Sequence, residues 1–245
     1  MTPTVRLYPF DTRSGPANLA ADEVLLDDAA AGVASLRFYL WDRPTLSLGY
    51  FQPAADRLRD PRLADLPWVR RASGGAAIVH GDGDLTYCLT LPPGKPWQGG
   101  ESWLCRFHHL LAAVLGGLGA PVTTVVCGRE RKLGPVLCFL HQTPADLLAA
   151  GSKVVGSAQR KLRGALMQHG TVRLRTSRFA PELPGLFELT GAAVSAGDLA
   201  GAAARAFAAE TGWAVVPAAW TPADDRRAAD LAAGKYATAG WNEKR

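Results

Sequence analysis

The sequence predicts a single mixed α/β domain over residues 1–245, with helices packed on mixed β-sheets. A chain of 245 residues suits one large domain or two small ones, and no linker, internal repeat or low-complexity tract divides it. Segments with the two-residue period of strands and the 3.6-residue period of helices interleave irregularly, which favours a mixed sheet. The composition, 48% hydrophobic and 20% charged, is that of an ordinary soluble globular protein.

Strands dominate the N-terminal half, where apolar runs predict them at residues 4–8, 36–41, 45–50, 67–71, 78–80 and 85–91. Two helices interrupt these strands. The first covers residues 16–31 and is closed by Gly32. The second covers residues 102–118 and is the clearest helix of the chain, because eight apolar positions follow the helical period.

The C-terminal half begins with strands and ends in helices. Strands are predicted at residues 122–126, 153–158, 165–168 and 170–174. A helix to about Glu210 begins at Ser195, where Asp198 gives capping-box spacing. A last helix, residues 221–233, has Pro222 at its first helical position.

Residues 72–77 form a glycine-rich loop between two predicted strands. Paired glycines let a backbone approach a ligand closely, and their N–H groups can form an anion-binding concavity. Two arginines, Arg70 and Arg71, precede this loop, and His80 follows it. The alternative is a plain hairpin turn with His80 as a structural histidine. The loop therefore indicates a binding site only in combination with other motifs.

Cys138 and Lys153 form the candidate catalytic pair. Two turns and a short apolar piece separate them and could fold the chain back to bring the thiol beside the ammonium. A neighbouring cation favours the thiolate, which is the nucleophilic form of cysteine. The alternative is a buried structural cysteine and a solvated lysine. Cys127, which precedes a basic run, is the competing nucleophile, whereas Cys88 and Cys105 have the patterns of packing residues.

The net charge, the basic clusters and the cysteine pattern limit the classes of partner and the cell compartment that we expect. The net charge of +5 and the pI near 9.2 permit an acidic partner. Basic clusters at residues 129–132 and 160–163 and at Arg173, Arg175 and Arg178 are most often solvated faces, and no nucleic-acid motif accompanies them. No apolar run approaches the ~18 to 20 residues of a membrane span, and no secretory signal is visible. Four cysteines without metal-ligand spacing suggest reduced thiols in the cytoplasm and no metal site.

Together these motifs resemble the lipoate/biotin protein ligase catalytic-domain family. The resemblance covers most of the chain and implies a single biotin/lipoate-ligase-like catalytic domain without an accessory C-terminal domain. It rests on four stretches: Arg37–Trp41 with Ser47–Gln52, Arg70–Gly75 with His80, Lys153–Gln159 with His169–Thr171, and Lys235-Tyr236 with Trp241-Asn242.

The position of Cys138 makes the chain most similar to one class of octanoyltransferase in this family. In that class the acyl-thioester cysteine lies upstream of the lysine motif, and here no cysteine follows Lys153. The resemblance implies transfer of octanoyl from acyl carrier protein to Cys138, and then to the lipoyl-domain lysine of an acceptor such as glycine-cleavage H protein. Lys153 would stabilise the thiolate and the oxyanion. Neither ATP nor another cofactor is expected.

The resemblance also implies which residues bind substrate: Arg71, Ser73, Gly74, Gly75, Ala76, Ala77, His80, Gly156, Ser157, Ala158, His169 and Gly170. Ala76 departs from the family pattern, in which many members have a third glycine or an arginine. Ile78, Val79 and Val154 are candidates for the wall around the acyl chain. Three alternatives remain: an ATP-dependent lipoate-protein ligase, an octanoyl amidotransferase between lipoyl domains, and a catalytically silent acyl-binding module.

Overall fold

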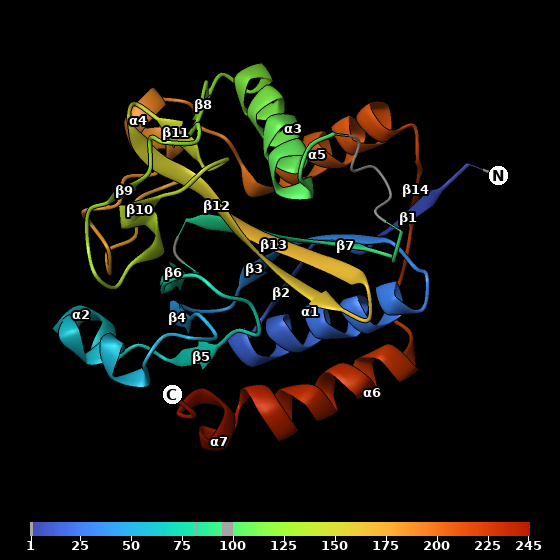
Figure 1. Cartoon of the computed structure of the whole chain (residues 1–245), viewed down its shortest axis with the longest axis horizontal. Helices are drawn as coiled ribbons and strands as arrows, with labels where there is room; N and C mark the ends of the chain where they lie inside the picture. Colours follow the sequence, from blue (N-terminus) through green and yellow to red (C-terminus); the bar gives the residue numbers. More distant parts are fainter. Residues whose placement is uncertain (1, 82, 95–99) are drawn as a thin grey trace.

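The computed structural model describes residues 2–81, 83–94 and 100–245. Its centre is a nine-stranded mixed sheet in the order β14-β1-β3-β7-β13-β12-β11-β8, with β2 paired to β3 (Figure 1). Pairing is parallel for β14-β1, β1-β3 and β2-β3 and antiparallel elsewhere. The predicted mixed α/β fold is therefore confirmed. The strands are β1 (Thr4–Leu7), β2 (Asp11–Arg13), β3 (Ser35–Trp41), β7 (Asp84–Leu91), β8 (Thr123–Thr124), β11 (Leu147–Ala149), β12 (Ser152–Leu162), β13 (Ala165–Arg173) and β14 (Ala214–Pro217).

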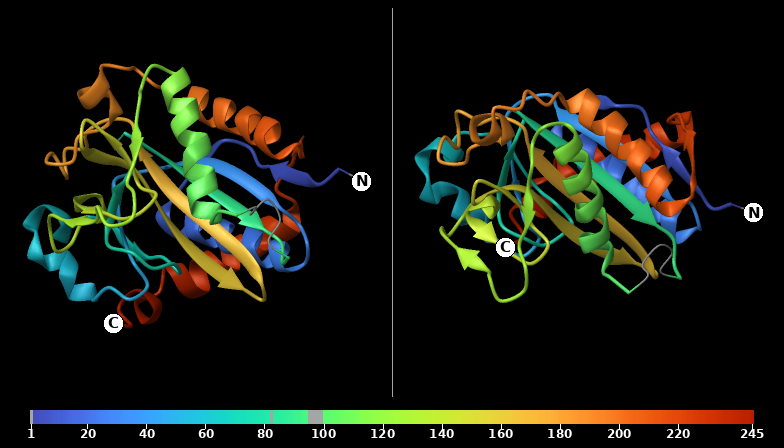
Figure 2. Two further views of the ribbon diagram at one scale, coloured as in Figure 1. Left: turned by 45° about the horizontal axis from the view of Figure 1, so that its top comes forward. Right: turned by 90° about the horizontal axis from the view of Figure 1, so that it is seen from above.

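Helices cover both faces of this sheet (Figures 1 and 2). On one face lie α1 (Gly15–Ala30) and α6 (Pro222–Leu231), whose apolar side chains pack with Tyr39, Cys88 and Met167. On the other lie α3 (Trp103–Gly117) and α5 (Ala196–Thr211). Their buried aromatic and aliphatic residues form the largest core cluster with the reverse sides of the same strands.

Local sequence explains where these helices begin and end. The hydroxyl of Ser102 accepts a hydrogen bond from the Cys105 N–H, and the hydroxyl of Ser195 accepts one from Asp198. Helix α5 ends at Gly212, which adopts the left-handed conformation at φ 68°. The two predicted helices at these positions are therefore confirmed to within about two residues.

A second, three-stranded sheet lies beside the first and carries the glycine-rich loop. It consists of β5 (Trp68–Arg70), β4 (Thr45–Leu48) and β6 (Ile78–His80), in the order β5-β4-β6. Leu46 and Val79 of this sheet pack against Leu137 and Phe139, which fixes the segment that carries Cys138. Short elements complete this region: η1 (Ala54–Arg59), α2 (Pro61–Ala64), η2 (Cys138–Leu140), and the two-stranded ladder of β9 (Arg131–Lys132) with β10 (His141–Gln142).

The C-terminal segment docks against the second sheet. After α6 it continues through a π-helical turn, η3 (Ala232–Tyr236), to α7 (Ala239–Asn242). The Asn242 side-chain oxygen accepts a hydrogen bond from the Arg70 N–H at 2.8 Å. The Trp241 indole donates to the Arg70 carbonyl oxygen at 2.7 Å. Trp241 and Asn242 thus hold β5, the strand that leads into the glycine-rich loop.

Several predicted elements were wrong in detail. Residues 165–173 form one strand, β13, and the predicted strand at 122–126 shortens to Thr123–Thr124. Strand β14 and the short helix α4 (Leu186–Thr190) were not predicted. Arg173 is not on a solvated face: it is 2% exposed, and its guanidinium donates to the Leu183 carbonyl oxygen. Along the ranges that the structure describes, no helix is long and apolar enough to cross a membrane.

Candidate active site

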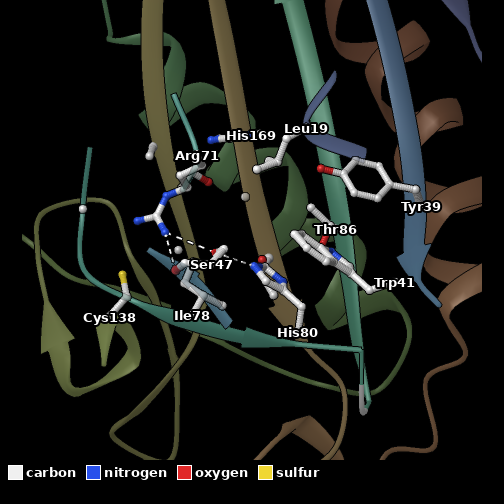
Figure 3. Close-up of a pocket in the computed structure, with 16 residues that line it drawn as sticks. Leu19, Tyr39, Trp41, Ser47, Arg71, Ile78, His80, Thr86, Cys138 and His169 are labelled. Carbon is white, nitrogen blue, oxygen red and sulfur yellow. Dashed lines mark hydrogen bonds between the residues drawn. The ribbon is translucent and has the colours of Figure 1, made fainter. Parts of the chain in front are cut away.

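A cavity with about 450 Å³ of empty space lies between the second sheet, helix α1 and the α1-covered face of the large sheet (Figure 3). The cavity brings together most of the residues that the sequence singled out. Those on its wall are Arg71, Gly75, His80, Cys138, Gly156, Ser157, Ala158, His169 and Gly170. Gly75 of the glycine-rich loop and Gly156 of the lysine motif therefore line the same cavity.

Lys153 lies beside Cys138, as the sequence predicted. Its ammonium Nζ is 3.7 Å from Cys138 Sγ and donates to the His141 carbonyl oxygen at 3.1 Å. The hairpin of β11 and β12 produces this arrangement, because it turns at Ala150 and Gly151, which both have positive φ. Lys153 is 5% exposed and not part of the wall, whereas Cys138 is half-buried and lines the cavity.

Asp146 completes this arrangement, and sequence reasoning missed it. Its carboxylate lies 2.7 Å from Lys153 Nζ, and both side chains are 3% exposed. The backbone N–H and the hydroxyl of Thr143 donate to the same carboxylate. The Thr143–Asp146 spacing, which is typical of a side-chain-stabilised turn, is the signal that could have revealed it. We call Cys138, Lys153 and Asp146 the thiol cluster.

The other three cysteines are unsuited to act in this cavity. Cys88 is fully buried in the large sheet, and burial raises the pKa of its thiol well above the usual value. Cys127 is exposed and does not line the cavity. Cys105 is half-buried, not a core residue as its helix pattern suggested, and its sulfur accepts a hydrogen bond from the Ser102 hydroxyl. Cys138 is thus the one thiol on the cavity wall.

Arg71 holds the glycine-rich loop from inside. Its guanidinium donates to the carbonyl oxygens of Gly74, Ala76 and Ser47. Burial lowers the pKa of Arg71 to about 10, an effect that the negative charge of a Cys138 thiolate opposes. Gly75 has φ 93°, and a Cβ there would lie 2.9 Å from the Arg71 guanidinium, so glycine is required.

Only part of the glycine-rich loop lines the cavity, and the rest supports the loop from behind. Gly75 lines the cavity, whereas Ser73, Gly74, Ala76 and Ala77 do not. Ala77 is fully buried and accepts a hydrogen bond from the Cys138 N–H at 2.7 Å, which ties the loop to the thiol. Within the described residues, the N–H groups of Gly75 and Ala76 have no hydrogen-bond partner. They are therefore available to an acyl oxygen.

Ser73, His169 and Asp22 form a second buried group, which we call the histidine cluster. The Ser73 hydroxyl lies 2.5 Å from His169 Nε2, and His169 Nδ1 lies 3.2 Å from an Asp22 carboxylate oxygen. Since the carboxylate accepts from Nδ1–H, a neutral His169 accepts at Nε2 from the serine. The phenol of Tyr39 also donates to Asp22, and burial together with that carboxylate raises the pKa of Tyr39. No local motif in the sequence indicated this cluster.

His80 is part of a rigid wall. Its Nδ1 lies 2.9 Å from an Asp84 carboxylate oxygen, and its Nε2 lies 2.9 Å from the Ser47 hydroxyl. The imidazole stacks on Trp41 with 4.0 Å between ring centroids. Burial lowers the pKa of His80, although Asp84 opposes the change. His80 is therefore held neutral in one orientation.

Strands β12 and β13 contribute small residues where space is needed. A Cβ on Gly156 would overlap the Lys153 side chain, and a Cβ on Gly170 would overlap the Ser157 hydroxyl. That hydroxyl bonds to Tyr87 and, at 2.5 Å, to His108 Nε2. Burial lowers the pKa of His108 to about 4. The glycines of the lysine motif thus leave room for Lys153 and for the polar contacts behind it.

The apolar part of the wall differs from the prediction. Ile78 lines the cavity, but Val79 and Val154 belong to separate core clusters and do not. The sequence missed several wall residues: Leu19, Tyr39, Trp41, Ser47, Thr86 and Thr171. Figure 3 shows Cys138 at one side of the cavity and Trp41 and Tyr39 at the opposite side. In the described part of the chain, no group of three or more His, Cys, Asp or Glu residues could hold a metal ion.

Comparison with known proteins adds to this geometry. The family model of the lipoyl protein ligase A/B catalytic domain matches residues 14–181. Octanoyltransferase LipM of Moorella thermoacetica is 32% identical over 99% of this chain and 98% of its own length. The protein of the same name from Kyrpidia tusciae is 31% identical over 99% of both chains. The crystal structure of lipoate-protein ligase A bound with ATP has a TM-score of 0.80 at 22% identity and covers 99% of both chains, a similarity of fold.

Proposed function

The chain belongs to the lipoyl protein ligase A/B catalytic-domain family and is an octanoyltransferase of lipoate biosynthesis, and we propose that Cys138 carries the octanoyl group during transfer. The observation that carries this proposal is the 3.7 Å separation of Lys153 Nζ from Cys138 Sγ, at the one thiol on the cavity wall. An ammonium at that distance favours a thiolate, which is the form that attacks an acyl group.

In the first step the Cys138 thiolate attacks the carbonyl carbon of an octanoyl thioester. A carbon–sulfur bond to Cys138 forms, the bond to the donor's sulfur breaks, and the donor leaves as a thiolate that takes up a proton. Negative charge develops on the carbonyl oxygen between these events. Lys153 and the N–H groups of Gly75 and Ala76 are the groups that can stabilise this charge.

In the second step the amine of an acceptor lysine attacks the octanoyl thioester on Cys138. An amide bond forms, the amine loses its proton, and Cys138 leaves as the thiolate that Lys153 stabilises. The acyl tail would extend from Cys138 toward Trp41 and Tyr39, which lie across the cavity (Figure 3). This placement buries the tail against the apolar wall that includes Leu19 and Ile78.

The reaction needs an acyl donor and a lipoyl-domain acceptor. We propose octanoyl-acyl carrier protein as the donor and a lipoyl domain such as that of glycine-cleavage H protein as the acceptor. Transfer through a thioester conserves the energy of the donor bond, so the proposed route uses no ATP. A thiolate nucleophile requires a reducing compartment, and a cytoplasmic location is therefore part of the proposal.

The test is to incubate the protein with octanoyl-acyl carrier protein in the absence of ATP and to measure its intact mass. We expect one octanoyl adduct, mapped to Cys138 by peptide mass spectrometry and absent from Cys138→Ser. Addition of a lipoyl domain should then remove the adduct and octanoylate the domain. Transfer only with ATP would indicate a ligase. An adduct formed only from an octanoylated lipoyl domain would indicate an amidotransferase. Absence of any adduct or transfer would indicate a silent acyl-binding module.

A further inference from the structure

Residues 126–133, which we call the basic loop, are a continuous exposed segment next to the thiol cluster. They comprise Val126, Cys127, Gly128, Arg129, Glu130, Arg131, Lys132 and Leu133, and each is exposed. Val126 is 60% exposed and Leu133 is 63% exposed. The segment therefore presents three cations and two large aliphatic side chains to solvent. Exposed apolar residues among charges are typical of surfaces that bind another protein.

The cations of the basic loop have no carboxylate partner among the residues that the structure describes. Among the described residues, no carboxylate forms an ion pair with Arg129, Arg131 or Lys132, and Glu130 accepts a hydrogen bond from the Gly128 N–H. Some other surface arginines are paired, for example Arg106 with Glu210 at 2.9 Å. The charge of the basic loop is therefore free to attract an acidic partner.

The basic loop is joined directly to the segment that carries the nucleophile. Strand β9 within it pairs with β10, so that Lys132 lies opposite His141. The Leu133 N–H donates to the Leu140 carbonyl oxygen at 2.8 Å. The His141 carbonyl oxygen in turn accepts a hydrogen bond from Lys153. Figure 1 shows β9 and β10 at the edge of the molecule, on the side away from the N-terminus, where a partner has access.

We infer that the basic loop is the docking surface for the acyl donor, an acidic carrier protein that presents octanoyl as a thioester on a phosphodiester-linked arm. This inference rests on the proposed function. The unpaired cations match the negative charge of the carrier and of its phosphodiester. A long arm lets the carrier bind the projecting loop while its thioester reaches Cys138. A lysine acceptor has only a four-carbon stem, so its own backbone must approach the cavity instead.

The test is a triple variant, Arg129→Gln with Arg131→Gln and Lys132→Gln, compared with a control of equal charge. The control replaces Lys161, Arg205 and Arg226 with Gln; all three are exposed and lie outside the basic loop. At low salt, the loop variant should form the acyl-enzyme from octanoyl-acyl carrier protein about tenfold more slowly at subsaturating donor. The control should remain within about twofold of the parent. Both should react normally with octanoyl-pantetheine, which has no carrier protein and thereby also reports correct folding.

A second measurement separates donor from acceptor. The parent and the loop variant are loaded on Cys138 with octanoyl-pantetheine, and transfer to a lipoyl domain is followed. Equal rates support the inference. A slower transfer to the lipoyl domain with normal loading from the carrier would assign the basic loop to the acceptor and overturn it. Equal losses in both triple variants would also overturn it, because the effect would then be one of net charge. If the parent protein forms no acyl-enzyme from either donor, the proposed function fails. If the parent and the loop variant form the acyl-enzyme from octanoyl-acyl carrier protein at the same rate, only the docking surface is refuted.

Discussion

The thiol cluster and the histidine cluster lie beside the same cavity but are built differently. The thiol cluster comes from one segment of the chain, in which Cys138 and Lys153 are 15 residues apart. The histidine cluster joins Ser73 to His169 across 96 residues and His169 to Asp22 across 147. Of the thiol of Cys138 and the hydroxyl of Ser73, only the thiol belongs to a residue on the cavity wall, because Ser73 does not line the cavity. The difference suggests that the first cluster performs chemistry and the second positions the wall.

The two clusters also differ in how their buried charges are paired. In the thiol cluster, a buried ammonium is shared between the Asp146 carboxylate at 2.7 Å and the Cys138 thiol at 3.7 Å. Removal of one partner from a buried ion pair leaves an uncompensated charge, which typically costs about 3 to 5 kcal/mol. In the histidine cluster, Asp22 already has the buried Arg37 guanidinium at 3.1 Å. Its charge is therefore balanced without help from His169.

The largest expected effect is that of Cys138→Ser. A serine hydroxyl is a far weaker nucleophile than a thiolate when no base activates it, so octanoyl transfer should fall roughly 10³-fold or more. The matched variants Cys127→Ser and Cys105→Ser should retain nearly full activity, because neither residue lines the cavity. Steady-state transfer to a lipoyl domain is the measurement. Activity that survives in Cys138→Ser but disappears in Cys127→Ser would transfer the nucleophile to the basic loop.

Lys153→Met should have the next largest effect, a fall in transfer of about 10²- to 10³-fold. The variant keeps much of the side-chain stem but removes the cation that contacts the thiol and that, in the proposed mechanism, stabilises the developing oxyanion. The rate at which Cys138 reacts with iodoacetamide at neutral pH should fall as well. Transfer should fall further than alkylation, since only transfer also needs the oxyanion to be stabilised.

The buried Asp146 makes a control for this variant necessary. Lys153→Met alone leaves the carboxylate unpaired and should lower the free energy of unfolding by about 3 to 5 kcal/mol. The double variant Lys153→Met with Asp146→Leu removes both charges and should regain most of that stability in urea unfolding. Its transfer rate should remain low. Recovery of transfer together with stability would mean that Lys153 acts only by holding the fold.

The thiol cluster could be predicted in part because its contacts are local. Turn residues between Cys138 and Lys153 indicated a chain reversal, and the β11–β12 hairpin provides it. Asp146 was not predicted, because a lone aspartate after a turn is ordinarily solvated. Only tertiary packing buries it, so that it is 2% exposed. The histidine cluster could not be predicted at all, since no periodicity or motif links Asp22 to a strand 147 residues away.

The same limit applies to the fold. Helix α3 was predicted almost to its ends, because eight apolar residues at helical spacing define one buried face without reference to the rest of the chain. Strand β14 was missed because it lies at the edge of the sheet, where its largely exposed residues give no alternating pattern. Its strand character depends on parallel pairing with β1, more than 200 residues away. Arg173 was wrongly expected on a solvated face for the same reason. The sequence does not show which helix or loop will cover the end of a strand.

Ser73→Ala tests the histidine cluster and should have a smaller effect on turnover, a fall of a few-fold. The substitution leaves a buried His169 nitrogen without its partner, which should lower the free energy of unfolding by about 1 to 3 kcal/mol. Activity and urea unfolding should be measured together, with Ser157→Ala for comparison, because Ser157 is a half-buried serine on the cavity wall that bonds to a different histidine. A loss of transfer as large as that of Lys153→Met would show that both clusters take part in the chemistry.

The smallest effect on turnover at neutral pH is expected for His108→Gln, and its consequence appears in acid. His108 lies behind the thiol cluster, where its Nδ1 contacts the carbonyl oxygen of Ala145, the residue before Asp146. Burial lowers its pKa from 6.5 to about 4. Between these values the unfolded chain binds a proton that the folded protein does not, so stability falls as the pH drops below about 6.5. Linkage gives a loss of about 2 kcal/mol in the free energy of unfolding between pH 7 and pH 5 from this group.

Urea unfolding across this range should show a shallower pH dependence in His108→Gln than in the parent. The matched control is His109→Gln, which changes the exposed neighbour on the same helix. If both variants keep the parent's slope, acid sensitivity does not originate behind the thiol cluster.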